Sequence, residues 1–157
     1  MGLTSFMNTL PTARRIAIVV YAIVGVALMF KGVEYLIASE VASYHQEVIR
    51  IPWDSLDEAE QTLLLGLLKG FGAGSFCVGL GVLVALVPLR RGVASARWGL
   101  AVMALAYTGV LMYVTRFALN PGAAPITVTE VLFALSVVAA VVSFIDREPR
   151  MIRNVWA

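Results

Sequence analysis

Cysteine and histidine are almost absent from this chain. Cys77 and His45 are the only residues of their types. A single cysteine cannot form an intrachain disulfide, a CxxC redox pair or a covalent haem attachment. A single histidine cannot supply two-histidine haem ligation or a histidine-rich zinc site within one subunit. Membrane thiol oxidoreductases are therefore excluded, metalloenzymes are disfavoured, and we expect neither a metal nor another cofactor.

Charge is also scarce. Charged residues make up 14% of the 157 residues, the net charge is +2, and hydrophobic residues make up 60%. The mean hydropathy is +0.86, outside the range of ordinary soluble domains. The basic residues cluster at the ends of apolar segments and form no continuous stripe, so a nucleic-acid-binding surface is not expected.

Four long apolar runs account for most of the chain, and each has about the 17–25 residues that cross a hydrocarbon core as a helix. They cover residues 16–38, 63–89, 98–117 and 128–145. The alternation that a membrane β-barrel requires is absent from them. The sequence therefore predicts an all-α integral membrane protein, a single domain over residues 1–157 with four transmembrane helices in a bundle.

The arginines predict how the bundle is oriented, because positive charge near short loops stays on the cytoplasmic side. Three clusters fall on one side of the predicted bundle: Arg14 and Arg15; Arg90, Arg91 and Arg97; Arg147, Arg150 and Arg153. Acidic residues concentrate in the first loop, on the other side. Both termini are expected to be cytoplasmic. A cleaved signal peptide ending near Val41-Ala42-Ser43 is the alternative interpretation of the first run.

The first loop, residues 39–62, is predicted to form an outer helical hairpin. No Gly or Pro interrupts residues 33–51, and apolar residues recur there at helical spacing, so the first helix is expected to continue to Ile51. Pro52 would then end it. A capping box from Ser55 to Glu58 would start the second helix, with Trp53 near the tip of the hairpin or folded back onto the headgroups.

Small residues follow one stripe of the second apolar run. Spacings of three and four place them together on a helix, and such stripes let helix backbones approach closely in lipid. The stripe consists of Gly66, Gly70, Gly74, Cys77 and Gly81. A looser stripe of Ala22, Gly25, Met29 and Gly32 makes the first helix its expected partner. Contact inside the monomer and contact between subunits both stay open.

Charged residues inside apolar runs are costly and need a partner or a route to the interface. In this chain they lie toward the outer side of the predicted bundle, and a tyrosine and the single histidine join them: Lys31, Glu34, His45, Lys69, Tyr113 and Arg116. Their structural interpretation is an i,i+3 pair between Lys31 and Glu34, with the other cations reaching the headgroups. Their functional interpretation is an outward-facing polar pocket that binds a ligand. Glu130 is expected to close a capping box with Thr127 at the start of the fourth helix.

Catalytic motifs are not recognisable in the sequence. Glu34, Lys31 and His45 could supply an acid–base pair, but no nucleophile elbow, phosphate loop or HExxH accompanies them. We therefore expect a non-catalytic accessory or scaffolding protein whose partners are membrane lipids and either a second copy of itself or a larger membrane protein. A lipid- or small-molecule-binding protein, conceivably an enzyme, that uses the outer pocket is the alternative.

The first helix through the second span also resembles a known group of sequences. Tyr44-His45, Pro52-Trp53, Leu56 and the stretch 68–74 are similar to those of small, uncharacterised bacterial four-span membrane proteins. Residues 40–43 depart from the aromatic and acidic motif that those proteins carry before the Tyr-His pair. The resemblance implies a location in the bacterial inner membrane and no particular activity.

Overall fold

The computed structural model describes residues 11–41, 46, 51–118 and 127–145. They form four long helices, α2 (Thr12–Ile37), α4 (Glu58–Arg90), α5 (Ala94–Ala118) and α6 (Val128–Ile145), and one 3-10 turn, η1 (Trp53–Ser55). No strand occurs among these residues. The all-α prediction is confirmed, and all four helices are long and apolar enough to cross a membrane.

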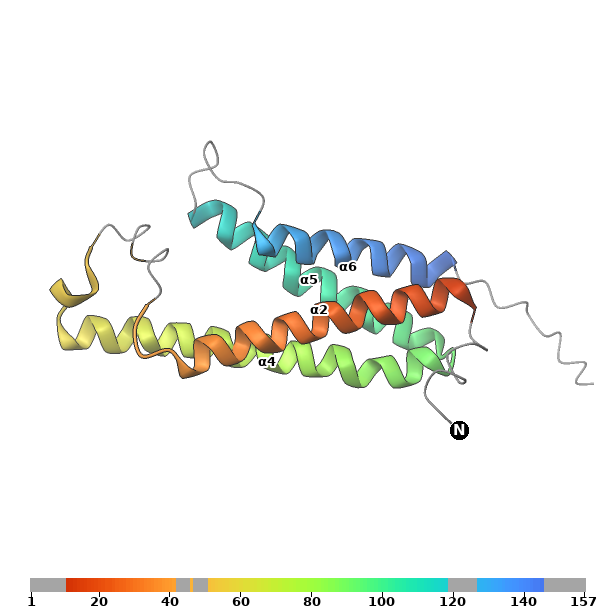
Figure 1. Ribbon diagram of the computed structural model, residues 1–157, viewed down its shortest axis with the longest axis horizontal. Helices are drawn as coiled ribbons and strands as arrows, with labels where there is room; N and C mark the ends of the chain where they lie inside the picture. The colour runs from red at the N-terminus through yellow and green to blue at the C-terminus, as the bar shows by residue number, and fades with distance from the viewer. Residues whose placement is uncertain (1–10, 42–45, 47–50, 119–126, 146–157) are drawn as a thin grey trace, which may run out of the picture.

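The helices run up and down in chain order (Figure 1). The start of α2 and the end of α6 lie at one end of the bundle, where the short α4–α5 connection also lies. α2 packs against α4 and α6, and α5 packs against the same two helices from the other side. α4 is the longest helix, with 33 residues and a length of about 50 Å. Its first turns therefore project beyond the ends of the other helices (Figure 1).

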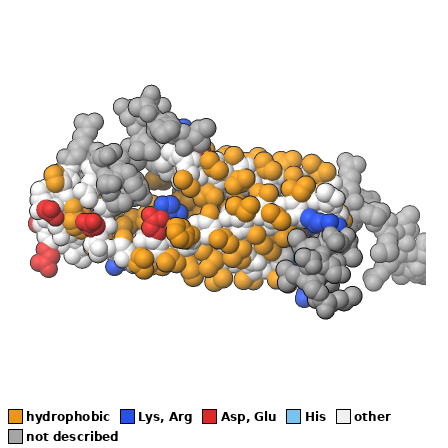
Figure 2. All heavy atoms as spheres, viewed as in Figure 1, with side chains coloured by type: hydrophobic (Ala, Val, Ile, Leu, Met, Phe, Trp, Pro, Cys, Tyr) orange, Lys and Arg blue, Asp and Glu red, His pale blue; other side chains and the backbone are white. Residues whose placement is uncertain are grey.

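The bundle is apolar outside and partly polar inside. Phe30 and Val102 are 72% and 64% exposed, whereas Ser75 and Thr108 are 1% and 0% exposed. The buried core runs along the bundle axis and includes Tyr21, Val24, Leu28, Val82 and Leu100. In Figure 2 hydrophobic side chains cover the middle and right of the face, acidic side chains lie toward the left end, basic ones lie at the right end, and one group of both signs lies between the left end and the middle. This distribution fits a protein whose solvent is lipid along its middle and water at its ends.

The two ends of α4 are fixed by local hydrogen bonds. Its N-cap is Asp57, which accepts a hydrogen bond from the Glu60 backbone N–H while the Glu60 side chain accepts one from the Asp57 N–H. The predicted box between Ser55 and Glu58 is wrong by two residues, because the Ser55 hydroxyl instead donates to the Pro52 carbonyl within η1. At the other end Gly92 adopts a φ of 78°, which a glycine tolerates and which lets its N–H reach the Leu89 carbonyl.

The first helix does not continue into the loop as predicted. α2 ends at Ile37, and Ala38 has an extended backbone with φ −59° and ψ 132°. The chain bends at Ser39 and Glu40, and Val41 is then only 5% exposed. Local helix preference is weak, and tertiary context readily overrides it. Most of residues 42–50 lie outside the described chain, so the rest of the predicted hairpin arm is not described.

Candidate functional site

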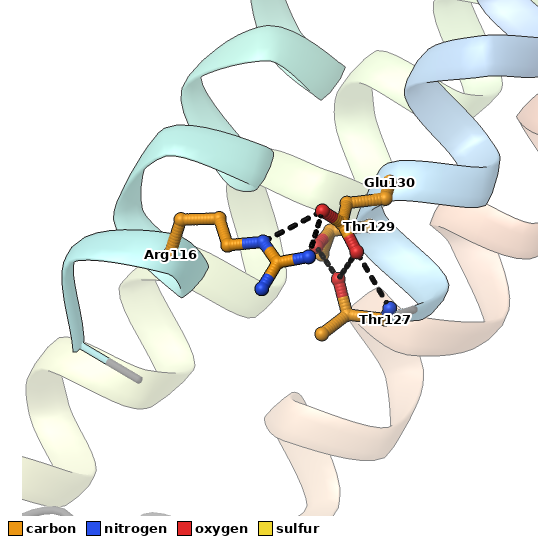
Figure 3. A network of polar contacts seen from close by, with 4 residues as sticks. All are labelled: Arg116, Thr127, Thr129 and Glu130. Carbon is orange, nitrogen blue, oxygen red and sulfur yellow. Dashed lines mark hydrogen bonds and ion pairs between the residues drawn. The ribbon is translucent and has the colours of Figure 1, made fainter. Parts of the chain in front are cut away.

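The most connected polar group joins the end of α5 to the start of α6 (Figure 3). Arg116 forms an ion pair with Glu130, and its Nε donates to the Glu130 carboxylate at 2.6 Å. The other carboxylate oxygen of Glu130 accepts the Thr127 backbone N–H at 2.8 Å and the Thr127 hydroxyl at 3.3 Å. The Thr127 hydroxyl also lies 2.9 Å from that of Thr129. Glu130 therefore serves two purposes, capping its own helix and holding Arg116 of the neighbouring one.

Only half of this arrangement follows from the sequence. The backward hydrogen bond from Thr127 N–H to Glu130, expected of a capping box, is present. The pairing with Arg116 was not predicted, because fourteen residues separate the two side chains and the intervening turn carries no signal of how it folds. Opposite charges flanking a short loop between antiparallel helices are the clue that could have indicated it.

A second charged pair lies near the end of α2. Lys31 Nζ donates to Glu34 at 2.8 Å, and the two side chains are 36% and 42% exposed. The ammonium group also lies 5.8 Å from the centre of the Tyr35 ring, within range of a cation–π contact. The expected i,i+3 pair is confirmed, and it gives Glu34 its cation from its own helix.

The remaining predicted site residues are not gathered around these pairs. Lys69 is exposed on α4, and Tyr113 is 68% exposed on α5. His45 lies outside the described residues. Two surface cavities lined by described residues occur elsewhere, one along α2 and α4 near Arg90 and one along the end of α6. The described residues thus bring together Lys31 with Glu34 and Arg116 with Glu130, each cation already satisfied by a carboxylate.

This chemistry is suited to holding helices rather than to a reaction. Each carboxylate accepts hydrogen bonds from a fixed cation, and Glu130 also accepts backbone and hydroxyl donors. Within the described part of the chain, no group of three or more His, Cys, Asp or Glu side chains is placed to hold a metal ion. A ligand at either pair would have to displace an existing ion pair.

A glycine seam joins α2 to α4. Gly25 meets Gly79, and Gly32 meets Gly72, and the two seam glycines of each helix are seven residues apart. A Cβ added to Gly79 would lie 2.6 Å from the Gly25 carbonyl oxygen, and one added to Gly32 would lie 2.7 Å from that of Gly72. Real Cβ atoms do not approach backbone atoms so closely, so only glycine allows the two backbones to pack at this distance.

The predicted stripe of α4 is not this seam. A Cβ on Gly66 or Gly70 would meet nothing within 4 Å, so neither glycine packs against another of the described helices. Gly74 and Gly81 face α5 instead of α2: a Cβ added to Gly74 would lie 3.7 Å from the Tyr107 hydroxyl, and one added to Gly81 would lie 3.3 Å from the Met103 sulfur. The predicted pairing of the stripe with α2 is therefore wrong. Gly25 and Gly32 do face α4 as predicted, but their partners lie on a neighbouring face of that helix.

Buried hydroxyl groups complete the contacts between helices. The Ser75 and Tyr107 hydroxyls lie 2.5 Å apart and link α4 to α5. The Thr108 hydroxyl lies 3.3 Å from that of Ser136 and links α5 to α6. These residues carry no distinctive signal in the sequence, because Ser and Thr in an apolar run look alike whether they bond across helices or to their own backbone.

Comparisons with known proteins add nothing to this geometry. No family model, curated protein or solved structure matches the chain.

Proposed function

We propose that this chain is a small multi-pass protein of the bacterial inner membrane that works without catalysis, as an accessory or scaffolding subunit. It associates with a second copy of itself through an open glycine face at the start of α4, and a larger membrane protein could use the same face. The membrane assignment rests on the four apolar helices. The bacterial assignment rests on the resemblance carried by residues 44–74.

The open glycine face carries the proposal. It consists of Leu63, Gly66, Leu67 and Gly70, which recur at i, i+3, i+4 and i+7 and so share one side of α4. Leu63 and Leu67 are each 64% exposed, and nothing lies within 4 Å of a Cβ on either glycine. Small residues spaced by four with large apolar neighbours are the usual surface for close helix association in lipid.

The paired charges support this function over a ligand pocket. A binding site for an anionic or cationic ligand would benefit from an unpaired charge facing a cavity. Here Glu34 and Arg116 each have a partner on the chain. The same pairs stabilise helix ends, which is what a scaffold requires.

The arginine end is proposed to be cytoplasmic. Arg14, Arg15, Arg90, Arg91 and Arg97 lie at helix ends that meet at one end of the bundle, whereas the described carboxylates belong to the other half. Positive charge near short loops is retained inside. A tag inserted at Asp54 should therefore react with an impermeant reagent in intact cells, and a reporter fused after Ala157 should be active only in the cytoplasm.

Self-association in vesicles tests the main proposal. The change is Gly70→Leu, measured by energy transfer between donor- and acceptor-labelled chains over a series of protein-to-lipid ratios. We expect association to fall roughly tenfold, because overpacking a close contact costs about 1–3 kcal/mol. Gly99→Leu is the matched control, because a Cβ at Gly99 also meets nothing within 4 Å but lies on α5.

Two results would contradict the proposal. One is a wild-type chain that stays monomeric at every ratio tested and co-purifies with no membrane protein whose retention depends on Gly70. The other is equal loss of association in Gly70→Leu and Gly99→Leu, which would mean that helix surfaces associate without a preferred face.

A further inference from the structure

An apolar groove runs along the outside of α2 and α4 toward the arginine end of the bundle. Its volume is about 820 Å³, and its walls are seven α2 residues between Ile18 and Phe30 together with Leu86, Val87 and Arg90 of α4. All of its lining residues except Arg90 are aliphatic or aromatic. It lies apart from the two ion pairs and from the open glycine face, and nothing in the proposed function requires it.

The groove has the length of a lipid chain in one leaflet. From Ile18 to Phe30 the α2 axis rises about 18 Å. Half of a hydrocarbon core is about 15 Å deep. Ala22 and Ala27 lie along the groove, where their small side chains leave room beside the larger walls. The groove therefore follows the path that one acyl chain takes from the headgroup region toward the bilayer centre.

A positively charged side chain lies at the headgroup end of the groove. Arg90 is the last residue of α4 and is half-buried beside the groove. The first turn of α2 and the start of α5 add further arginines at the same end of the bundle (Figure 1). The carboxylates of the described residues all lie toward the opposite end of the bundle or in the first loop. The charged side chains that the described residues place at the mouth of the groove are therefore basic.

We propose that this groove is a binding site for an anionic phospholipid, with one acyl chain along α2 and the phosphate of the headgroup on Arg90. A guanidinium group binds a phosphate with two parallel hydrogen bonds, which suits this role better than a compact ammonium group. A second helix is a poorer occupant, because bulky Ile23, Val26 and Phe30 line the groove where a close helix contact needs small residues. A zwitterionic lipid would bring its own cation toward the arginines.

The proposal is tested with the full chain in phosphatidylcholine vesicles that contain spin-labelled lipids. The motionally restricted fraction is compared for labelled phosphatidylglycerol and labelled phosphatidylcholine. We expect phosphatidylglycerol to be preferred about fivefold, the effect of one basic residue on an anionic lipid. Arg90→Gln should remove most of this preference, and Arg90→Lys should keep part of it. Arg91→Gln is the matched control, because Arg91 is exposed at the same helix end but does not line the groove.

A second variant tests the groove without changing its charge. Ala22→Phe should fill part of the cavity and reduce the restricted fraction of both lipids. Val102→Phe, an equally apolar change on an exposed position of α5, should leave that fraction unchanged. Circular dichroism and the melting temperature in detergent establish that each variant keeps its fold.

Several outcomes would overturn the site. If the wild type restricts the two lipids equally, the headgroup does not bind Arg90. If Arg90→Gln and Arg91→Gln have equal effects, the preference for phosphatidylglycerol comes from general surface charge and not from the groove. No effect of Ala22→Phe would show that the acyl chain lies elsewhere. A number of restricted lipids per chain that falls at high protein-to-lipid ratios, and still falls in Gly70→Leu, would place a second chain in the groove.

Discussion

The two helix pairs of this bundle are held together by different means. α2 and α4 meet backbone to backbone at Gly25 with Gly79 and at Gly32 with Gly72. α5 and α6 are instead joined by side chains, through the Thr108 and Ser136 hydroxyls in the middle and the Arg116–Glu130 pair at the end. Lipid gives helices no hydrophobic reason to associate, so each pair needs either close packing or polar bonds. This chain uses one device for each pair.

The two kinds of helix contact differ in how strongly a substitution disrupts them. At Gly32, Gly72 and Gly79 an added Cβ would lie less than 3.0 Å from backbone atoms of the other helix, so it must push two backbones apart. A polar contact tolerates small displacements, and losing it costs only the difference between the bond and its replacement. Substitutions in the glycine seam are therefore expected to be more damaging than substitutions in the polar contacts.

The largest effect is expected from Gly79→Leu. Its Cβ would lie 2.6 Å from the Gly25 carbonyl oxygen and 2.8 Å from the Met29 backbone nitrogen, and neither atom can move without moving α2. We expect the free energy of unfolding in mild detergent to fall by about 3 kcal/mol or more. Thermal melting measures the loss. Gly99→Leu, placed where a Cβ meets nothing within 4 Å, should change the melting temperature little. Similar losses in the two variants would mean that α2 and α4 do not meet at these glycines.

The ion pair of the other helix pair should come second. Arg116→Met leaves Glu130 with its own helix cap but without its cation, and Glu130→Gln removes the charge while keeping an acceptor for Thr127. We expect each single variant to lower the melting temperature by a few degrees, less than Gly79→Leu. The double variant should lose less than the sum, because the two groups act on each other. Strictly additive losses would show that the pair does not join α5 to α6.

The difference between the two devices also explains what the sequence could predict. Four apolar runs of membrane-spanning length predicted four helices, and the i,i+3 spacing of Lys31 and Glu34 predicted their pair; both depend on local sequence alone. The seam between α2 and α4 depends on which face each helix turns to the other. Gly72, Ser75 and Gly79 also recur at spacings of three and four, but the stripe through Gly66 and Gly70 is longer, so the sequence favours that stripe. The clue was the equal seven-residue spacing of Gly25 and Gly32 on one helix and of Gly72 and Gly79 on the other.

The candidate site is predicted less completely for the same reason. The sequence places Arg116 beside Lys31 and Glu34, because the three share a depth in the bundle. The structure pairs it with Glu130 across the α5–α6 turn, a contact between residues fourteen apart. Depth along a bundle follows from the positions of the spans. The angle at which a side chain points around its helix follows only from the packing of all four helices.

A smaller effect is expected from the hydroxyl contact in the middle of α5 and α6. The Thr108 and Ser136 hydroxyls each have a nearer acceptor on their own helix, the Ala104 carbonyl at 2.6 Å and the Leu132 carbonyl at 2.8 Å. Each hydroxyl has one hydrogen, so the 3.3 Å contact between them competes with these bonds. We expect Thr108→Val to cost about 0.6 kcal/mol of stability. Thr108→Ser keeps the hydroxyl, so it should retain the coupling to Ser136 in a double-variant cycle. If that cycle shows no coupling, the two hydroxyls do not contribute to the α5–α6 interface.

The smallest effect is expected from Glu34→Gln, because this pair joins no two helices. Lys31 and Glu34 lie one turn apart on α2, and both side chains are more than a third exposed. Such a pair contributes about 0.2–0.5 kcal/mol. A double-variant cycle of Glu34→Gln with Lys31→Met should show coupling of this size, and the cycle with Lys69→Met should be additive, since Lys69 is exposed on α4. Coupling to Lys69 instead of Lys31 would place the carboxylate between α2 and α4. If Glu34→Gln raised stability and the variant also failed to complement a deletion strain, the carboxylate would be held for a ligand, and the outer site would replace the scaffold as the proposed function.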